Sequence, residues 1–490
     1  MTSNPESIVQ QLHQEFQNLL AYVSGPEARS QTAYSVELTL FRRLLALGAA
    51  LLRLFFVTRA AVRPAEPVTA PDGTRLTSHD QRPTTDYSVF GNVCFGRHSF
   101  TSIGHEGLCP VDAELSLPAR GYADLRREWA VDGTTDESYR ESQTGLARIL
   151  GRSLSVQALE TCVTEAGADV TTFYEQPADP TAPVPGGTIL VVQADGNGVP
   201  RVQASPQTPP VHLGKGQKRG KKQEAVVTGL YTIAPYSRTP QEVVAALLPE
   251  PGGPAPAARP RPEGKELRAT LEGKAVAMSR LVQRVAQRDG PSIQQRVALT
   301  DGAEALQQQV GTHVPEYTLI LDVIHATESL WDTANALLGE THPQRLAWVR
   351  AYLEPLLAGQ SDAIITALEA EAKDPTCTVT QQQAVRRTVG YDRRHQPYMH
   401  DDAYLARGWP IGTGVVEGAC GHLVNDRLEQ AGMRWTTGGA PAVLDRRAVR
   451  INGHWEAYGP FHRQQHHQRL YGRSAPAPTS AEARALEWAA

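Results

Sequence analysis

Three short apolar runs in the middle of the chain each lead directly to an aspartate. The runs are TILVVQA before Asp195, RVALT before Asp301 and YTLIL before Asp322. Apolar runs of this length that are rich in β-branched residues predict buried strands, and Gly196 and Gly198 predict a break after Asp195. Because sites in open sheets lie outside the carboxyl ends of the strands, we expect the three aspartates to lie near one another.

The stretch from Gly408 to Trp435 has a different pattern. A run of turn residues leads into a predicted helix that begins near Val415, and its apolar positions recur at helical spacing: Val416, Cys420, Leu423 and Val424. Glu417 lies in the first turn, where the helix N-terminus favours a carboxylate without any ligand. Nearby glycines leave space for a ligand, so a functional role for Glu417 is the alternative.

Four acids are therefore candidates for one site. An Asp-Gly pair is most often a plain turn, and each acid alone has an ordinary structural explanation. Together, carboxylates from strand ends and a helix would form the hard-oxygen cage that suits Mg²⁺. His325 follows Asp322 by about one helical turn, so the two side chains are expected to pair on one helix face.

The N-terminal part of the chain is predicted to be mostly helical. Residues 35–62 are strongly apolar, but arginines interrupt them, so the uncharged run is shorter than the ~20 residues that span a bilayer. We expect a buried or partner-facing helix there and no membrane span. Residues 145–167 predict a helix, a short turn and a second helix capped by Ser155, which fits a helix-turn-helix or an ordinary helical hairpin.

Residues 77–118 are predicted to be rich in strands and loops. Cys94, His98, His105 and Cys109 lie in this region, but the paired Cys-x-x-Cys spacing of a zinc site is absent. We therefore expect a degenerate zinc-ribbon-like region, with bound zinc as the alternative. The five cysteines of the chain are scattered and odd in number, which is typical of a reducing cytoplasm.

The other segments have simpler patterns. Residues 174–185 are proline-rich and predict a linker, residues 225–236 predict a strand, and residues 266–288 predict a helix. Residues 326–396 are predicted to be mostly helical. The end of the chain is rich first in histidine and then in proline and alanine, which predicts a mobile tail.

Charge argues against a nucleic-acid binder at first sight. The net charge is −4 and the isoelectric point is near 6.4, whereas proteins that neutralise phosphates usually have a basic excess. Cations are concentrated locally, however, in a segment that is either a solvated loop or a backbone-binding loop: Lys215, Lys218, Arg219, Lys221 and Lys222. Arg427 and Arg434 suit phosphate contact, and Trp435 suits stacking on a base.

These motifs resemble those of a DDE transposase from a bacterial insertion sequence of the ISKra type, related to the Mutator-like group. The matching segments are ADGNGVP at Asp195, TDGAEAL at Asp301, LDVIHATESLW at Asp322, and IGTGVVEGACGHLV at Glu417 with AGMRW after it. The resemblance covers roughly residues 186–458 and, more loosely, the region from Tyr87 onward. The glutamate motif is long and specific, whereas the aspartate motifs are short but occur in the order of the family.

The resemblance implies an α/β multidomain protein whose catalytic core is ribonuclease-H-like with a helical insertion, preceded by a mostly helical region with a helix-turn-helix. It implies that Asp195, Asp301 and Glu417 bind two Mg²⁺ ions, which Mn²⁺ can replace, and that Asp322 with His325 is an accessory element. The implied domains are residues 1–75 (helical), 76–120 (zinc-ribbon-like), 121–175 (helix-turn-helix), 186–325 and 406–460 (core), 326–405 (insertion) and 461–490 (tail).

The implied activity is cleavage of DNA at transposon ends and strand transfer into target DNA. The implied partners are double-stranded DNA, namely terminal inverted repeats and target, and further copies of the chain in a homodimer or higher oligomer. The implied location is the bacterial cytoplasm, at the nucleoid. Two alternatives remain: a ribonuclease-H-like nuclease or resolvase, and an inactive DNA-binding relative. Whether Asp301 or Asp322 is the second metal ligand also remains open, and Asp301 is preferred because Gly302 leaves room for a metal.

Overall fold

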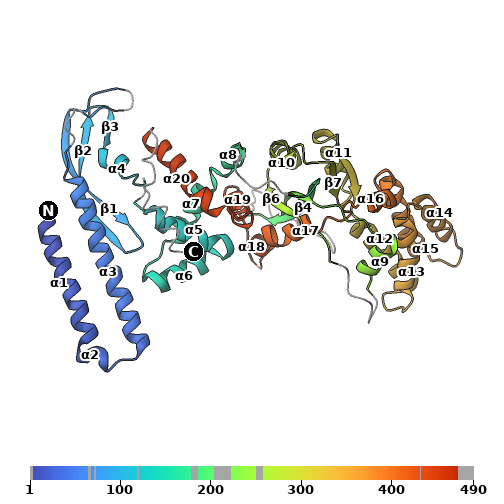
Figure 1. Cartoon of the computed structure of the whole chain (residues 1–490), viewed down its shortest axis with the longest axis horizontal. Coiled ribbons are helices and arrows are strands. Elements are labelled where there is room, and N and C mark those ends of the chain that lie inside the picture. The colour runs from blue at the N-terminus through green and yellow to red at the C-terminus, as the bar shows by residue number, and fades with distance from the viewer. Residues whose placement is uncertain are drawn as a thin grey trace, which may run out of the picture. The chain divides into compact units, whose positions relative to one another are not determined.

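The structure is a computed structural model that describes residues 4–63, 68–70, 73–118, 121–177, 186–202, 222–249, 258–430 and 432–472. The chain is a mixed α/β protein that divides into two compact units (Figure 1). Unit 1 consists of Met1–Val170 and Trp455–Ala490, and unit 2 consists of Thr171–His454. The prediction of an α/β multidomain protein is confirmed. Most of the predicted linker, residues 178–185, lies outside the described residues.

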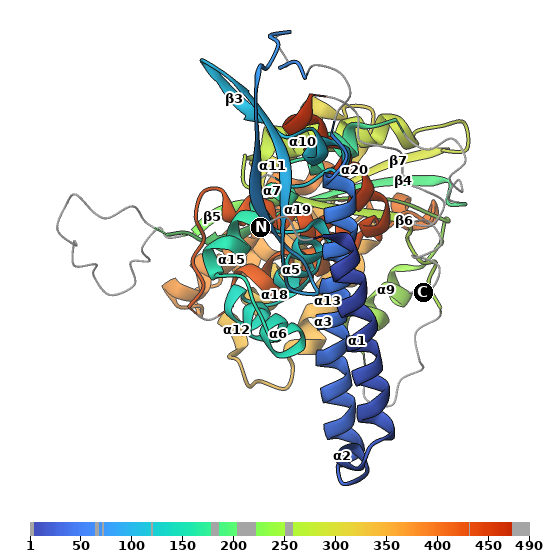
Figure 2. The ribbon, with the colours of Figure 1, turned by 90° about the vertical axis from the view of Figure 1, so that its left-hand side faces the viewer.

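Unit 1 begins with a helical hairpin. Helices α1 (Pro5–Ser24) and α3 (Ala33–Ala60) run side by side and are joined by α2 (Pro26–Arg29) (Figures 1 and 2). Phe56 and Ala60 are the buried residues of α3, whereas Phe41, Leu44 and Leu51 are exposed. The prediction that α3 is buried is therefore wrong, and a partner-facing helix stays a prediction. None of the described helices has the length and apolar character needed to cross a bilayer.

A three-stranded antiparallel sheet follows, with the order β1 (Ser78–Tyr87), β2 (Asn92–Ser102), β3 (His105–Leu108), and α4 (Pro110–Glu114) comes after it. The predicted β-rich region is confirmed. The ring of Phe95 in β2 stacks on the ring of Phe56 in α3, with 4.5 Å between the ring centroids. His98 pairs with His79 at 2.7 Å, and the Cys94 thiol lies 3.2 Å from the Thr85 hydroxyl. These two candidate zinc ligands thus have separate protein partners.

Three helices form the part of unit 1 in which a helix-turn-helix is predicted: α5 (Asp124–Asp136), α6 (Tyr139–Leu150) and α7 (Val156–Gly167). Gly151 ends α6 in the left-handed region at φ 68°, and Ser155 caps α7 by accepting the Ala158 N–H. The two helices, the turn and the cap are confirmed. The exposed side chains of α7 include Gln157 and Glu160, and the helix has no lysine or arginine. DNA recognition by α7 therefore stays a prediction.

The C-terminal segment returns to unit 1 as helix α20 (Trp455–Tyr471). The Tyr458 hydroxyl donates to the Ala166 carbonyl at 2.5 Å, and Asp169 accepts hydrogen bonds from His462 and Arg469. The prediction that a mobile tail begins at residue 461 is therefore wrong for the described part of the segment, because His462 and Arg469 pair with the buried Asp169. Residues 473–490 lie outside the described part.

Unit 2 is built on a five-stranded sheet with the order β6-β5-β4-β7-β8. The central strand β4 pairs antiparallel with β5 and parallel with β7, and β7 pairs parallel with β8. The three predicted strands that lead to aspartates are thus confirmed as neighbours. The strands are β4 (Ile189–Pro200), β5 (Lys222–Ile233), β6 (Glu263–Thr270), β7 (Gln295–Thr300) and β8 (Thr318–Leu321).

Both faces of this sheet are covered, which explains why its central strands are apolar on both sides. Leu190, Val192 and Ala194 of β4 pack against α10 (Lys274–Arg288) and α11 (Glu304–His313). Ile189 and Val191 project to the opposite face, which is covered by α9 (Pro240–Leu247), α12 (Val323–Leu338) and α13 (Arg345–Leu357). The alternation of β4 side chains therefore separates two cores.

Two predictions about strands need correction. β4 does not break at Gly196 and Gly198 but continues to Pro200, because β5 pairs with it along its whole length. The predicted helix from residue 266 is wrong for its first turns, because residues 263–270 form β6 on the open edge of β5. The backbone pairing and burial of β6 outweigh a weak local preference for helix in these residues, and α10 begins only at Lys274.

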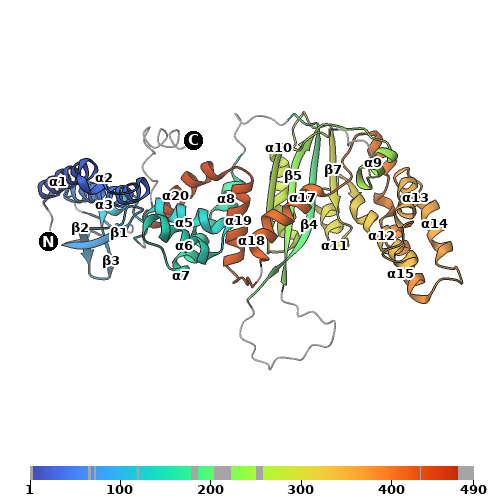
Figure 3. The ribbon, with the colours of Figure 1, turned by 90° about the horizontal axis from the view of Figure 1, so that it is seen from below.

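The prediction that residues 326–396 are mostly helical is confirmed, because a group of helices follows β8. This group contains α12 and α13, then α14 (Ser361–Glu371), α15 (Val379–His395), the short 3-10 helix η1 (Gln396–Tyr398) and α16 (Asp401–Ala406). Figure 3 shows α12 to α15 gathered beyond β7. Their shared core includes Leu356, Leu368 and Val385. Further helices are α8 (Val170–Glu175) and α19 (Gly439–Ile451), which packs against β6.

Candidate active site

Three polar side chains project from one face of β4: Gln193, Asp195 and Asn197. Residues two apart in a strand share a face, and this face also carries Ile189 and Val191. Residues 412–425, which include Glu417, lie over it, because Gln193 and Asn197 both form hydrogen bonds to that segment. The pairing of β4 with β7 ends at Ala194, one residue before Asp195. Asp195 therefore lies at the end of the parallel part of the sheet.

Gln193 fixes the start of the glutamate segment. Its side chain is buried, its Nε2 donates to the Tyr231 hydroxyl at 3.0 Å and to the Gly412 carbonyl at 3.1 Å, and its Oε1 accepts from the Val416 N–H at 3.0 Å. A buried amide is stable only when such partners satisfy it. These bonds join β4 to the turn that precedes Glu417.

The glutamate lies on a continuous helix of three parts: α17 (Gly414–Ala419), a π-helical turn η2 (Cys420–Asn425) and α18 (Asp426–Leu428). The predicted apolar face is confirmed as buried. A π-turn disturbs the regular hydrogen bonds of a helix and is often found at functional sites. Here Asn197 donates to the Cys420 carbonyl at 3.3 Å and to the Asn425 side chain at 2.8 Å, so β4 also supports the π-turn.

Asp322 is fully buried and held by four hydrogen bonds. It caps α12 by accepting the Ile324 N–H, and it accepts the backbone N–H and the hydroxyl of Thr413. The fourth donor is His325 Nδ1, at 2.8 Å. Burial alone would raise the pKa of Asp322, but the hydrogen bonds from His325 and Thr413 lower it below its usual value. Asp322 is therefore a fixed anion that orients its neighbours.

His325 and Glu417 meet beside this buried anion. The Thr413 hydroxyl lies 2.8 Å from both Asp322 Oδ2 and Glu417 Oε1, and His325 Nδ1 lies 3.7 Å from Glu417. The hydrogen bond to Asp322 raises the pKa of His325 to about 9, so the ring is an imidazolium at neutral pH. Burial raises the pKa of Glu417, and the nearby Asp322 raises it further.

Asp301 is positioned by the end of β7 and by α15. Its Oδ1 accepts the Ala303 N–H at 2.9 Å, and its backbone carbonyl accepts from the Tyr391 hydroxyl. The next carbonyl, that of Gly302, accepts from His395 Nε2 at 2.9 Å. Gly302 has φ +93°, and a Cβ there would lie 2.9 Å from the Tyr391 hydroxyl. Helix α15 therefore holds the loop that presents Asp301.

Asp195 completes the group. Its Oδ1 accepts the Gly196 N–H at 2.6 Å, and its Oδ2 lies 3.3 Å from the Cys420 thiol, a weak donor. Burial raises the pKa of Asp195, and the negative charge of Asp301 raises it further. Burial and then Asp195 raise the pKa of the Cys420 thiol as well. The carboxylates of Asp195 and Asp301 are thus close enough to influence each other.

The structure brings together all five residues predicted to be catalytic, but it does not group them as the predicted metal triad. Within the described residues, the side chains whose ligand atoms lie within 4.8 Å of one another are those of Asp322, His325 and Glu417. An imidazolium cannot bind a metal through its protonated nitrogen, and Asp322 already accepts four hydrogen bonds. These contacts favour Asp322 as a supporting residue, and the triad of Asp195, Asp301 and Glu417 stays a prediction.

The residues predicted to bind DNA lie in different environments in the structure. The basic segment lies outside the described residues except for Lys222, whose ammonium group pairs with Glu429. The prediction is wrong for Arg427 and Trp435, because both are buried. The Arg427 guanidinium lies over the Trp435 ring at 4.8 Å, and the indole N–H donates to the Leu428 carbonyl, so the pair packs inside the fold. Arg434 is exposed, and its role stays a prediction.

Sequence reasoning missed several residues that support the site. Gln193 had a detectable signal, since a glutamine inside an apolar strand must find buried partners. Thr413 lies four residues before Glu417, but nothing in the sequence indicates its contact with Asp322. Tyr391 and His395 lie about 90 residues beyond Asp301, and only the tertiary structure connects them.

No protein-family profile and no curated protein sequence matches this chain. The geometry of the site and the motifs around it therefore carry the functional conclusion.

Proposed function

We propose that this protein is a metal-dependent phosphoryl-transfer enzyme acting on DNA, namely a transposase of the DDE type. The observation that carries the proposal is the convergence of Asp195, Asp301, Asp322 and Glu417 with His325 at the end of the parallel strands of unit 2. Acids from separate strands and a helix, supported by a buried hydrogen-bond network, are typical of a catalytic site. A chain with only structural acids has no need of this concentration of charge.

The sheet supports assigning unit 2 to the ribonuclease-H-like fold. Three antiparallel strands are followed by two parallel ones in the order β6-β5-β4-β7-β8. That order places the first aspartate on the central strand and the second on its parallel neighbour. The helices α12 to α16 lie between β8 and the glutamate helix in the chain, as the proposed helical insertion requires.

The donor atoms suit Mg²⁺. All three proposed ligands offer carboxylate oxygens, which Mg²⁺ prefers. Asp301 accepts the Ala303 N–H through Oδ1, which leaves Oδ2 for a cation, whereas the Glu417 carboxyl also shares a side-chain hydrogen bond with Asp322 that a bound cation would replace. Burial and neighbouring acids raise the pKa of Asp195 and Glu417, and a divalent cation would relieve both effects. When bound, two Mg²⁺ ions would supply an activated water or 3′-hydroxyl and stabilise the leaving oxygen.

The other residues have orienting and electrostatic roles. Asp322 keeps His325 protonated and fixes its ring, so the imidazolium can stabilise negative charge on a scissile phosphate. The Thr413 hydroxyl lies 2.8 Å from both Asp322 Oδ2 and Glu417 Oε1, and Gln193 fixes the backbone on either side of Thr413. Tyr391 and His395 hold the Asp301 loop. Such support keeps the reacting geometry fixed during the reaction.

Unit 1 is proposed to recognise transposon ends through α6 and α7. The partners proposed are terminal inverted repeats, target DNA and further copies of the chain. A nuclease or resolvase on the same fold would share the metals without strand transfer. An inactive DNA-binding relative would share the fold without cleavage, but an intact set of four acids favours an active enzyme.

The proposal is tested by cleavage of labelled DNA that carries the ends of the surrounding genetic element, with Mg²⁺ present. Glu417→Gln and Asp195→Asn preserve shape and remove a carboxylate, so each should abolish cleavage and joining while DNA binding persists. Glu429→Gln is a matched control, because Glu429 pairs with Lys222 away from the acids. Near-normal cleavage by Glu417→Gln or Asp195→Asn would contradict the proposal. Cleavage by the wild type without joining would favour a nuclease.

A further inference from the structure

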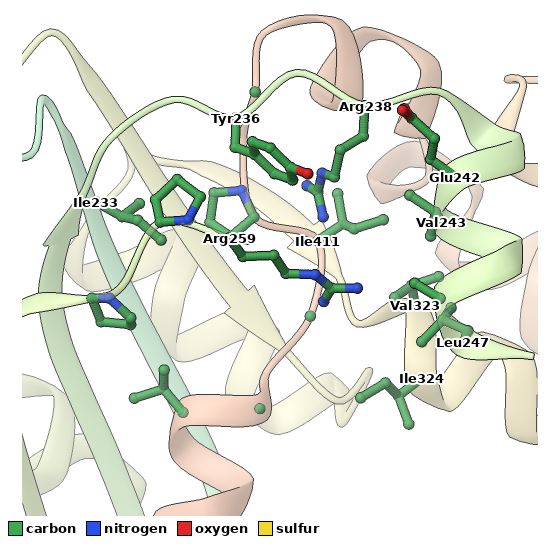
Figure 4. A pocket seen from close by; sticks show the side chains of 18 of the residues that line it. Ile233, Tyr236, Arg238, Glu242, Val243, Leu247, Arg259, Val323, Ile324 and Ile411 are labelled. Carbon is green, nitrogen blue, oxygen red and sulfur yellow. The ribbon is translucent and has the colours of Figure 1, made fainter. Parts of the chain in front are cut away.

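Unit 2 contains an apolar cavity beside the acids. Its volume is about 570 Å³, and it lies between the end of β5, α9, the start of α12 and the segment 408–415. Its walls include Ile233, Val243, Leu247, Val323 and Ile411 (Figure 4). This size is within the range of cavities that enclose a small organic ligand, roughly 300–1,000 Å³. None of the carboxylates proposed to bind Mg²⁺ lines it, so it is a separate feature.

Two arginines enter this apolar space. Figure 4 shows the Arg238 side chain beside Tyr236 and Ile411, and the Arg259 side chain extending across the pocket toward Val323. Arg238 Nη2 donates to the Trp409 carbonyl at 2.6 Å, which fixes the group in place. Its Nε is buried and has no hydrogen-bond partner within the described part of the chain. The Arg238 guanidinium therefore keeps one buried N–H that the described residues do not satisfy.

Neither guanidinium group forms an ion pair with a carboxylate among the described residues. The negative charges of Asp401 and Glu242 favour the protonated form of Arg238 only from a distance. Glu242 lines the cavity, but its carboxylate accepts the N–H and the hydroxyl of Thr239 and so caps α9 instead. Burial lowers the pKa of Arg238, and the positive charge of Arg259 lowers it further. The half-buried Arg238 guanidinium thus lies near a second cation, and an anion bound between Arg238 and the exposed Arg259 would offset the unfavourable effect on Arg238.

We propose that this cavity binds a small anion with an apolar body, whose anionic group pairs with Arg238 and Arg259 and whose apolar part fills the space lined by Val243, Leu247 and Val323. A carboxylate, phosphate or sulfonate would accept charge-assisted hydrogen bonds from both guanidinium groups. The apolar walls give no hydrogen bonds, so the body of the ligand must be largely hydrocarbon or aromatic. The site does not depend on the proposed phosphoryl-transfer activity.

Such a ligand would touch the segments that carry two of the acids. Val323 and Ile324 directly follow Asp322, and Val415 lies two residues before Glu417. A ligand in the cavity would therefore pack against the segments that carry Asp322 and Glu417. This position makes the cavity suited to a ligand that stabilises the site.

The test uses the full-length protein and isothermal titration calorimetry with dodecanoate as the probe. Dodecanol has the same chain without the charge and serves as the matched ligand. We expect one dodecanoate per chain, bound at least about tenfold more tightly than dodecanol, because the alcohol lacks the charge-assisted hydrogen bonds. Equal affinity for the two ligands, or no binding of dodecanoate, would overturn the proposal.

Three variants locate the bound probe. Arg259→Gln should weaken dodecanoate about tenfold, and Ala246→Phe, which places a ring in the cavity, should abolish its binding. Arg261→Gln is the matched control, since Arg261 is exposed and does not line the cavity. Arg259 is also exposed, so its exchange tests the proposal even if Ala246→Phe destabilises the fold. Unchanged affinity in Arg259→Gln would show that dodecanoate binds elsewhere and would refute the assignment.

Discussion

Asp392 is a carboxyl group that the fold buries without a partner, and replacing it with asparagine should change how stability depends on pH. It lies on α15 with 1% of its surface exposed, and its Oδ2 has no hydrogen bond among the described residues. Burial raises its pKa from 3.8 to about 7. The carboxyl is therefore protonated in the folded protein and ionised in the unfolded chain between these two values.

The sign of the effect follows from proton binding. Between pH 3.8 and about 7 the folded state holds a proton that the unfolded state has released, so the free energy of unfolding falls as the pH rises. The contribution of Asp392 to the free energy of unfolding stops changing above about pH 7. From pH 5 to pH 8 the loss amounts to roughly 2–3 kcal/mol for this one group. Asparagine is neutral throughout, so Asp392→Asn should lack this part of the decline.

The assay is urea unfolding followed by tryptophan fluorescence at several values between pH 5 and pH 8. Trp348 packs against the same core as Val389 on α15, so its emission reports on this region. The stability of Asp392→Asn relative to wild type should rise by roughly 2–3 kcal/mol across this range. Asp332→Asn, which replaces an exposed aspartate of α12, is the control. Parallel pH profiles for wild type and Asp392→Asn would refute the reasoning.

Three further predictions concern the support of the acids. Gln193→Leu should lower the free energy of unfolding by roughly 2–4 kcal/mol and slow DNA cleavage, because it leaves the Gly412 carbonyl and the Val416 N–H without partners. Unchanged stability in urea unfolding would contradict this role of Gln193. Gly302→Ala should destabilise the fold by roughly 1–3 kcal/mol, because Gly302 has φ +93° and the new Cβ would contact Tyr391. Gly311→Ala in α11 is the control and should stabilise the fold slightly. Thermal unfolding compares the two variants, and equal effects would contradict backbone strain at Gly302. His325 should titrate near pH 9 by NMR, so the favourable pairing with Asp322 is present below pH 6.5 and lost as the pH rises through about 9; a midpoint near 6.5 in the wild type would refute the pairing.

The sequence predicted the strands that lead to Asp195, Asp301 and Asp322, because parallel central strands are apolar on both faces and their pattern is unambiguous. It also predicted the apolar face of the glutamate helix. It failed at β6, where ELRAT suits either a helix or a strand and pairing with β5 decides the outcome. It failed in the same way at Gly196, where pairing with β5 carries β4 through two glycines.

The site itself was predictable as a set of residues but not as an arrangement. The pairing of Asp322 with His325 follows from helical spacing and is confirmed at 2.8 Å. The contacts of Thr413 with Asp322 join residues 91 positions apart, and no local pattern indicates them. Arg427 and Trp435 show the opposite error, since a cation and an aromatic ring that suit DNA instead pack on each other inside the fold. Residue type alone cannot distinguish these environments.

The central claim is that Asp195, Asp301 and Glu417 bind divalent metal while Asp322 orients His325. Its most direct test is titration of the full-length protein with Mn²⁺, followed by electron paramagnetic resonance of the free ion. We predict that the wild type binds two Mn²⁺ ions, that Asp301→Asn loses at least one of them, and that Asp322→Asn retains both with weaker affinity. Absence of Mn²⁺ binding by the wild type would contradict the claim. Loss of Mn²⁺ in Asp322→Asn, with full binding in Asp301→Asn, would contradict the assignment of the second ligand.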